Sequence, residues 1–409
     1  MATIPQAASY LRSIAKTKKA LSSARAVAAA QRLADLDHDM RPEHAELICA
    51  VALAWSENKN PERSVWSDSS DWRGPRAHGV AMQRLDITAL QLMRPDDVIM
   101  LAYAHTTYAD GELEWLHNAE DSEFHAAVVE LYRGMARVYS EDALWRRVPK
   151  TMYPLRERRA AIVSATLTKL STALVMAWER YGDPEIALAG VDVARRAAEL
   201  DPRTAARNAW GKAGWAAYQV TGERAFLDEA LAVLRPLAAR TPADHPSAPA
   251  VGDNLLVCLG TLALADHDSA VLDEALALGM HLLPSAGSTS PGGFWEVRAH
   301  LVPLLVAQSQ RDQNPASLAQ ALALAQEGVR AAHADRSGLD DRGPRPLPTY
   351  PLADVALAQV YLARAQATGM RQDARAAVSA AQIAEKLCGR FWKSLEQYTS
   401  GLAGAACRL

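Results

Sequence analysis

One stretch of the sequence gathers side chains that could bind a metal ion. Glu114, His117, Asp121 and His125 follow one another at steps of 3, 4 and 4 residues. On a helix these steps place all four side chains on one face, and a Glu-x-x-His spacing is used in di-iron helix bundles. Such a site needs a second helix with the same motif, and the sequence contains none. The alternative is a hydrated helix surface with local ion pairs, so we assign no metal and no cofactor.

Motifs of catalysis are missing elsewhere in the sequence. It contains no Ser-His-Asp order, no nucleophile elbow and no Gly-x-x-x-x-Gly-Lys-Ser/Thr phosphate loop. We therefore lean away from an enzyme and assign no catalytic residue. An enzyme or small-molecule binder stays open as the alternative, with a pocket between N-terminal helices and the rest of the chain. Its candidate residues are His105, Glu114, His117, Asp121 and His125.

The elements that would position any site are marked by a repeated phrase. It reads Asn208-Ala-Trp-Gly-Lys-Ala-Gly214, then Leu227-Asp-Glu-Ala-Leu231, and it returns as Asn254-Leu-Leu-Val-Cys-Leu-Gly260, then Leu272-Asp-Glu-Ala-Leu276. The first half recurs after 46 residues, from 208 to 254, and the second after 45, from 227 to 272. Self-similarity at this period indicates a helical repeat array.

Each repeat unit is predicted to be a pair of helices. Small residues such as Gly214, Gly260, Ala230 and Ala275 let paired helices approach closely. One hairpin cannot bury its apolar stripe alone, so neighbouring hairpins must stack. We expect an all-α fold: an α-solenoid of about five hairpins over residues 153–409, ending in a capping helix, preceded by an N-terminal helical domain over residues 1–152. A polar loop over residues 56–79 contains Trp66 and Trp72, either as binding anchors or as plugs over the core.

Composition narrows the class of protein further. Hydrophobic residues make up 49% of the chain and aromatic residues only 6%, so alanine dominates and favours helix. A net charge of −3 argues against a general nucleic-acid binder. The most apolar stretch, residues 47–55, is too short to span a bilayer, so we expect no membrane partner. The four cysteines include no Cys-x-x-Cys pair, as expected for reduced thiols in a cytoplasmic protein.

Three phrases resemble a known family. Trp178-Glu-Arg-Tyr-Gly-Asp-Pro184, Thr241-Pro-Ala-Asp-His-Pro246 and Leu272-Asp-Glu-Ala-Leu276 are similar to tetratricopeptide-like (TPR) repeats of actinobacterial type. The resemblance covers roughly residues 158–390. Arrays of this kind often accompany caspase-like (CHAT) proteases or signalling ATPases, but this chain shows no such catalytic domain. The resemblance therefore implies a protein-binding surface and carries over no catalytic residue.

In arrays that resemble this one, the first helix of each hairpin lines a concave groove. Asparagine amides there can bind the backbone of an extended peptide, while arginine and lysine receive its carboxylates. Asn208 and Asn254 could equally each hold a neighbouring turn. Our main expectation is a non-enzymatic adaptor or regulatory scaffold that binds a protein or peptide. The candidate partner-binding residues are Arg207, Asn208, Lys212, Trp215, Asp253, Asn254, Trp295, Arg298, Tyr350 and Asp354.

Overall fold

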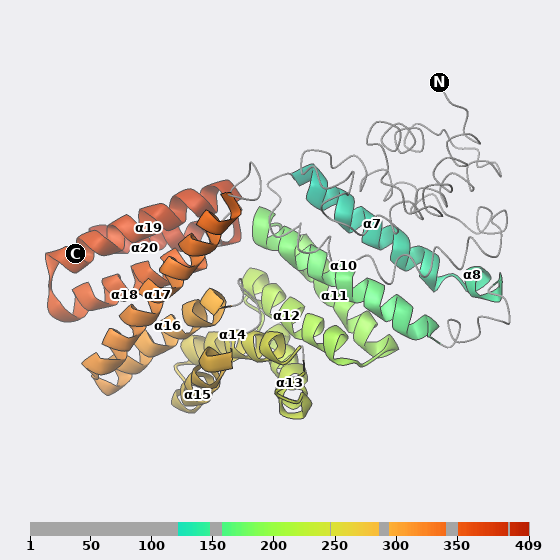
Figure 1. The fold of residues 1–409 in the computed structure, drawn as a ribbon, viewed down its shortest axis with the longest axis horizontal. Helices are drawn as coiled ribbons and strands as arrows, with labels where there is room; N and C mark the ends of the chain where they lie inside the picture. The colour runs from blue at the N-terminus through green and yellow to red at the C-terminus, as the bar shows by residue number, and fades with distance from the viewer. Residues whose placement is uncertain are drawn as a thin grey trace, which may run out of the picture. The chain divides into compact units, whose positions relative to one another are not determined.

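A computed structural model of the chain describes residues 122–147, 158–245, 247–285, 294–340, 351–391 and 393–408. The elements in these ranges are all helices, which confirms the all-α prediction for them (Figure 1). In chain order they are α7 (Ser122–Ser140), α8 (Asp142–Arg147), α10 (Arg159–Tyr181), α11 (Pro184–Leu200), α12 (Thr204–Thr221), α13 (Arg224–Arg240), α14 (Ala248–Asp266), α15 (Ser269–Ser285), α16 (Phe294–Asp312), α17 (Pro315–Asp340), α18 (Leu352–Thr368), α19 (Arg371–Phe391) and α20 (Lys393–Cys407).

The chain divides into two compact units. One unit comprises Met1–Met176 and Asp192–Ala206, and the other comprises Ala177–Val191 and Arg207–Leu409. The junction that the sequence places near residue 152 lies outside the described residues, as do the predicted N-terminal helices before residue 122 and the polar loop at 56–79.

Five helical hairpins follow one another from α10 to α19, which confirms the predicted pairing of helices. Each hairpin turn consists of two residues, and the first of them has a positive φ. A left-handed residue after a helix lets its amide satisfy a carbonyl of the last turn, and glycine adopts this conformation most readily. The residues with positive φ at the five turns are Gly182, Gly222, His267, Gln313 and Gly369.

The second turn residue starts the next helix in three of the five hairpins. The carboxylate of Asp183 accepts from the amide of Glu185 at 3.0 Å, and Asp268 accepts from Ala270 at 2.8 Å. Asn314 accepts from Ala316 at 3.0 Å. Amides in the first turn of a helix have no partner within the helix, so these side chains satisfy donors that would otherwise be left to water. Helix, left-handed residue and capping residue thus form one local unit that repeats along the chain.

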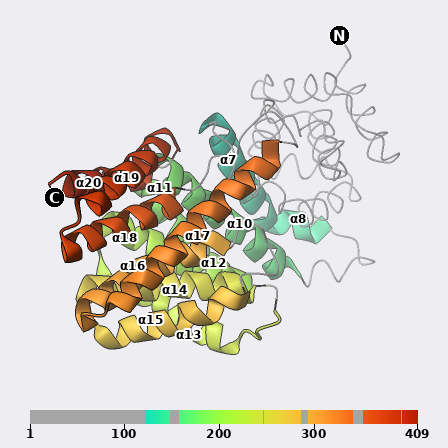
Figure 2. The same ribbon diagram turned by 60° about the vertical axis from the view of Figure 1, so that its left-hand side comes forward.

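The hairpins stack through both kinds of helix in the unit that contains residues 207–409. From α13 onward each helix packs against the next one. The first helices of successive hairpins also pack together, α14 against α16 and α16 against α18, and the final helix α20 packs against α18 and α19 (Figure 2). Helix α20 therefore packs on both helices of the last hairpin.

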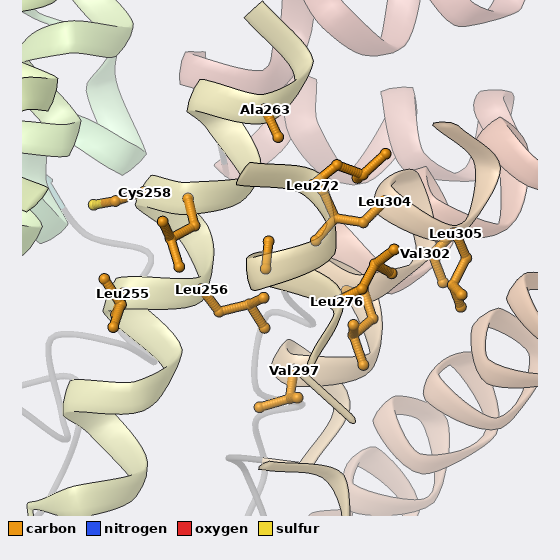
Figure 3. Close-up of a cluster of buried hydrophobic side chains, with 14 of the residues drawn as sticks. Leu255, Leu256, Cys258, Ala263, Leu272, Leu276, Val297, Val302, Leu304 and Leu305 are labelled. Atoms are coloured by element: carbon orange, nitrogen blue, oxygen red, sulfur yellow. The ribbon is translucent and has the colours of Figure 1, made fainter. Parts of the chain in front are cut away.

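A continuous apolar core runs through these hairpins. It extends from Leu227 on α13 to Ala363 on α18, and aliphatic side chains of α14, α15 and α16 meet at its centre (Figure 3). In the repeated Leu-Asp-Glu-Ala-Leu phrase, both leucines and the alanine are buried in each copy, at 227, 230 and 231 and at 272, 275 and 276. The phrase is therefore the core-facing stripe of the second helix.

Glycines and alanines set how closely the paired helices approach. A methyl group placed on Gly214 would lie 3.1 Å from the backbone oxygen of Phe226 and 3.2 Å from Cβ of Ala230. Helix α12 therefore contacts α13 with almost no side chain between them, as the small residues in the sequence predict.

Among the helices that the structure describes, two are long and apolar enough to cross a membrane when judged by length and composition alone. They are Arg159–Tyr181 and Ala248–Asp266, whose most apolar windows are 61% and 50% buried within the structure. This degree of burial is typical of core helices in a helical stack.

Candidate functional site

Equivalent residues of the first helices form a row of polar contacts. Asn208 on α12, Asn254 on α14 and His300 on α16 follow one another at intervals of 46 residues. The side-chain amide of Asn254 donates from Nδ2 to Oδ1 of Asn208 at 2.9 Å. Two residues that occupy the same place in successive repeats thus bind each other directly across the interface between two hairpins.

The row continues from α14 to α16. Oδ1 of Asp253, which precedes Asn254, lies 3.0 Å from Nδ1 of His300. The side chains of Asp253 and His300 are 18% and 22% exposed, so the pair lies at the surface margin of the stack. Each of the two interfaces between α12, α14 and α16 therefore carries one polar contact at the same level of the helices.

An ion pair extends the row in the other direction, to α10. Nζ of Lys212 lies 3.6 Å from Oε1 of Glu179, whose side chain is only 7% exposed, whereas that of Lys212 is 32% exposed. A buried carboxylate needs such a partner, because desolvation disfavours its charge. We call these six residues, Glu179, Lys212, Asn208, Asn254, Asp253 and His300, the polar row.

The asparagine pair uses only part of its hydrogen-bonding capacity. Each amide offers an oxygen that accepts and a nitrogen that donates two hydrogens. The mutual bond leaves Nδ2 of Asn208 and Oδ1 of Asn254 available for further hydrogen bonds. Both residues are half-buried. The pair presents one donor group and one acceptor to a ligand.

Aromatic and apolar side chains lie about two to three turns further along the same helices. The indole of Trp215 packs edge-on against Trp178, with ring centroids 5.9 Å apart, and its Nε1 donates to Oγ1 of Thr261 at 3.1 Å. Tyr218 is half-buried at the edge of the core, and Leu264 is 38% exposed. Trp215, a predicted partner-binding residue, therefore packs between the first helices of neighbouring hairpins.

Other residues predicted to bind a partner have different surroundings. The guanidinium of Arg298 pairs with Glu327 of its own hairpin at 2.7 Å, and its side chain is 11% exposed. Asp354 is buried in α18 at 3% exposure. Arg207 is half-buried on α12, next to Asn208. The side chain of Trp295 and the whole of Tyr350 lie outside the described residues.

The alternative metal or small-molecule site falls mostly outside the described residues. This applies to His105, Glu114, His117 and Asp121, so their proximity remains a prediction. His125 lies on α7 and is buried at 1% exposure. Among the described residues, no group of three or more His, Cys, Asp or Glu side chains could hold a metal ion.

The acidic residues of the Leu-Asp-Glu-Ala-Leu phrase make contacts within the stack. Glu274 forms a two-point ion pair with Arg235, at 2.7 and 3.1 Å, which connects α15 to α13. Glu229 accepts from Nε1 of Trp210 at 3.1 Å. Because these acidic side chains are used in contacts between helices of the stack, the candidate site is the surface of the first helices that carries the polar row.

Two members of the polar row, His300 and Glu179, were not singled out from the sequence. His300 had a usable signal, because it follows Asn254 by the same 46 residues that separate Asn254 from Asn208. Glu179 had none, since the first two turn residues, Gly182 and Gly222, are 40 residues apart, so the 46-residue period does not extend to α10.

Comparison with known proteins adds one structural likeness. No family model matches the chain, and no curated protein matches its sequence. Among solved structures, the chain is similar to the crystal structure of the yeast Tom70, with 13% sequence identity and a TM-score of 0.34, over 94% of this chain and 80% of that one. The all-α array of stacked helical hairpins is seen in the chain's own helices.

Proposed function

We propose that the chain is a non-enzymatic scaffold that binds a protein or peptide at the polar row. The observation that carries this proposal is the asparagine pair: two equivalent, half-buried amides on α12 and α14 bond each other, and this bond uses only part of their hydrogen-bonding capacity. Repeat arrays commonly present their binding surface on one kind of helix, because each unit repeats the same face.

The chemistry of the row suits a peptide backbone. A main-chain carbonyl can accept from Nδ2 of Asn208, and a main-chain amide can donate to Oδ1 of Asn254. Lys212, about a third exposed, adds a cation beside these amides for an acidic side chain of the ligand. Trp215 and Tyr218 on the same helix supply apolar contact area, and aromatic side chains often contribute most to such interfaces.

Affinity capture tests this proposal. The tagged full chain is compared with the Asn208→Leu/Asn254→Leu variant, in which leucine keeps the side-chain size and removes every amide hydrogen bond. The proteins that wild type retains from a native lysate are identified by mass spectrometry. We expect the retained partner to be depleted about tenfold or more in the variant, since two hydrogen bonds of about 1 kcal/mol each are removed.

The matched control is Arg235→Gln/Glu274→Gln. This pair joins the second helices α13 and α15, and both side chains are 45% exposed. The control should retain the same partner as wild type. Equal retention by all three proteins would refute the polar row as the binding surface. Circular dichroism and urea unfolding confirm that each variant is folded.

A further inference from the structure

We propose that two arginine side chains hold the stack closed at its hairpin turns, by pairing with the aspartate of the Leu-Asp-Glu-Ala-Leu phrase, and that salt opens the stack there. The two residues are Arg224 and Arg311, and we call their contacts the arginine clasps. Each clasp joins the second helix of one hairpin to the first helix of the next. This inference does not depend on what the polar row binds.

The first clasp lies between α13 and α14. Arg224 is the first residue of α13 and Asp266 is the last residue of α14, and Nη1 of the arginine pairs with Oδ2 of this aspartate. Nε of Arg224 donates at 2.7 Å to Oδ1 of Asp228, which is the aspartate of the repeated phrase. Asp228 therefore orients an arginine that reaches across to the next hairpin.

The second clasp lies between α15 and α16, and here the arginine comes from the other helix. Nη1 of Arg311, the last residue but one of α16, pairs with Oδ1 of Asp273 at 2.9 Å. It also donates at 3.3 Å to the carbonyl oxygen of Ser269, the first residue of α15. Asp273 is equivalent to Asp228 in the repeated phrase. The exposed aspartate of the phrase thus binds a clasp arginine in both copies, although the two arginines are not equivalent in sequence.

The apolar core does not extend to the ends of the helices that meet at the turns. The chain connects α13 to α14, and α15 to α16, only at the opposite ends of these helices, through residues 241–247 and 286–293. At the turn ends the paired helices are therefore held by contacts between exposed residues, and the clasps lie there. The exposed residues are 224–225 and 264–266 in the first pair of helices and 269–270 and 310–312 in the second.

The clasps should depend on ionic strength. A single exposed ion pair contributes little to stability, but a network of several charges can contribute measurably. Arg224 contacts two carboxylates, and Arg311 contacts two carboxylates and a backbone carbonyl. The Debye length falls from about 30 Å at 0.01 M salt to about 3 Å at 1 M. Salt should therefore weaken the clasps and loosen the turn ends, while the apolar core stays packed.

Hydrogen exchange of the full-length chain, measured by mass spectrometry, tests the proposal in the helix that carries no substitution. Arg224→Gln should speed exchange in the last turn of α14 about two- to fivefold. Arg311→Gln should do the same for the first hydrogen-bonded amides of α15, from Leu272 onward. In wild type, about 1 M salt should speed exchange at both places relative to about 0.01 M, and each substitution should remove most of this salt effect at its own clasp.

The matched control is Arg240→Gln, which removes the same charge from α13. Arg240 donates to the carbonyl oxygen of Pro236 in its own helix, so this variant should leave exchange in α14 unchanged. Amides around the buried Leu256, in the middle of α14, should keep the wild-type rate in every variant.

Three results would overturn the proposal. The first is that both clasp variants exchange like wild type in the facing helix. The second is that Arg240→Gln speeds exchange in the last turn of α14 as much as Arg224→Gln does. The third is that exchange around Leu256 rises together with exchange at the turn ends, because the helices would then unfold as a whole and the turn ends would not open separately.

Discussion

A single methyl group placed on Gly279 tests how the hairpins pack. Gly279 lies on α15, and a Cβ there would lie 2.2 Å from Cδ2 and 2.7 Å from Cγ of Leu301. Leu301 belongs to α16 and is fully buried in the core, so it has no free space into which to turn. Gly279→Ala must therefore push α15 and α16 apart or force Leu301 out of its preferred rotamer.

The expected magnitude is the sum of two opposing effects. Overpacking a filled core costs about 1–3 kcal/mol, whereas replacing glycine by alanine within a helix gains about 1 kcal/mol of helix propensity. The net result should be a loss of roughly 1 kcal/mol in the free energy of unfolding. Gly401→Ala is the matched control, because Gly401 lies within the exposed part of α20 and a Cβ there meets nothing within 4 Å. That variant should be stabilised by about 0.5–1 kcal/mol.

Urea unfolding followed by far-ultraviolet circular dichroism measures both variants. The reasoning would be refuted if Gly279→Ala stabilised the protein as much as Gly401→Ala, because α15 and α16 would then not be in the described contact. A double variant sharpens the test. Leu301→Ala alone should cost about 2–5 kcal/mol through the cavity that it leaves. It should cost less in the Gly279→Ala background, where the new methyl group occupies part of that space.

Three further predictions concern single side chains. Burial raises the pKa of the Cys258 thiol to about 12, so its reactive thiolate is scarce at every pH below that value. In a variant in which Cys49 and Cys388 are replaced by serine, Ellman's reagent should modify the exposed Cys407 at once. It should modify Cys258 only after the protein is unfolded. His267 holds a φ of 54°, so His267→Gly should raise the free energy of unfolding by about 1 kcal/mol in urea; a loss of stability would contradict this. Trp215→Phe removes the bond to Thr261 and should cost about 1 kcal/mol. In the same urea assay, Thr261→Val should then cost less in the Phe variant than in wild type, whereas strictly additive effects would show that the bond contributes nothing.

The hairpin order was predictable because the local signals agree with the packing. The Leu-Asp-Glu-Ala-Leu phrase carries its two leucines and its alanine on one side of a helix, and this side is buried in both copies. Polar breaks such as those around Gly222 and His267 coincide with the observed turns. A helix, its end and its buried side depend on neighbours within a few residues, so the sequence specifies them directly.

The contacts of the candidate site were less predictable, because they depend on how one helix is placed against the next. The period identifies Asn208 and Asn254 as equivalent, but the bond between them depends on the approach of α12 to α14. For Asp354, the alignment of the repeats places the wrong residue of α18 at the position equivalent to Asn254. Asn254 and His300 each lie 13 residues before the left-handed residue of their turn, at 267 and 313, and the corresponding position in α18, 13 residues before Gly369, is Ala356.

The shared turn geometry has a consequence for the length of the array. Gly222 and His267 occupy the same backbone position in adjacent hairpins, 45 residues apart. Deleting residues 223–267 would therefore connect Gly222, after α12, directly to Asp268, before α15. The new turn would again consist of a left-handed residue and a residue that precedes a helix, and the chain would be shorter by one repeat. Gene-level duplication or loss of such a segment could lengthen or trim this protein in whole units, and with it the reach of any ligand that it holds.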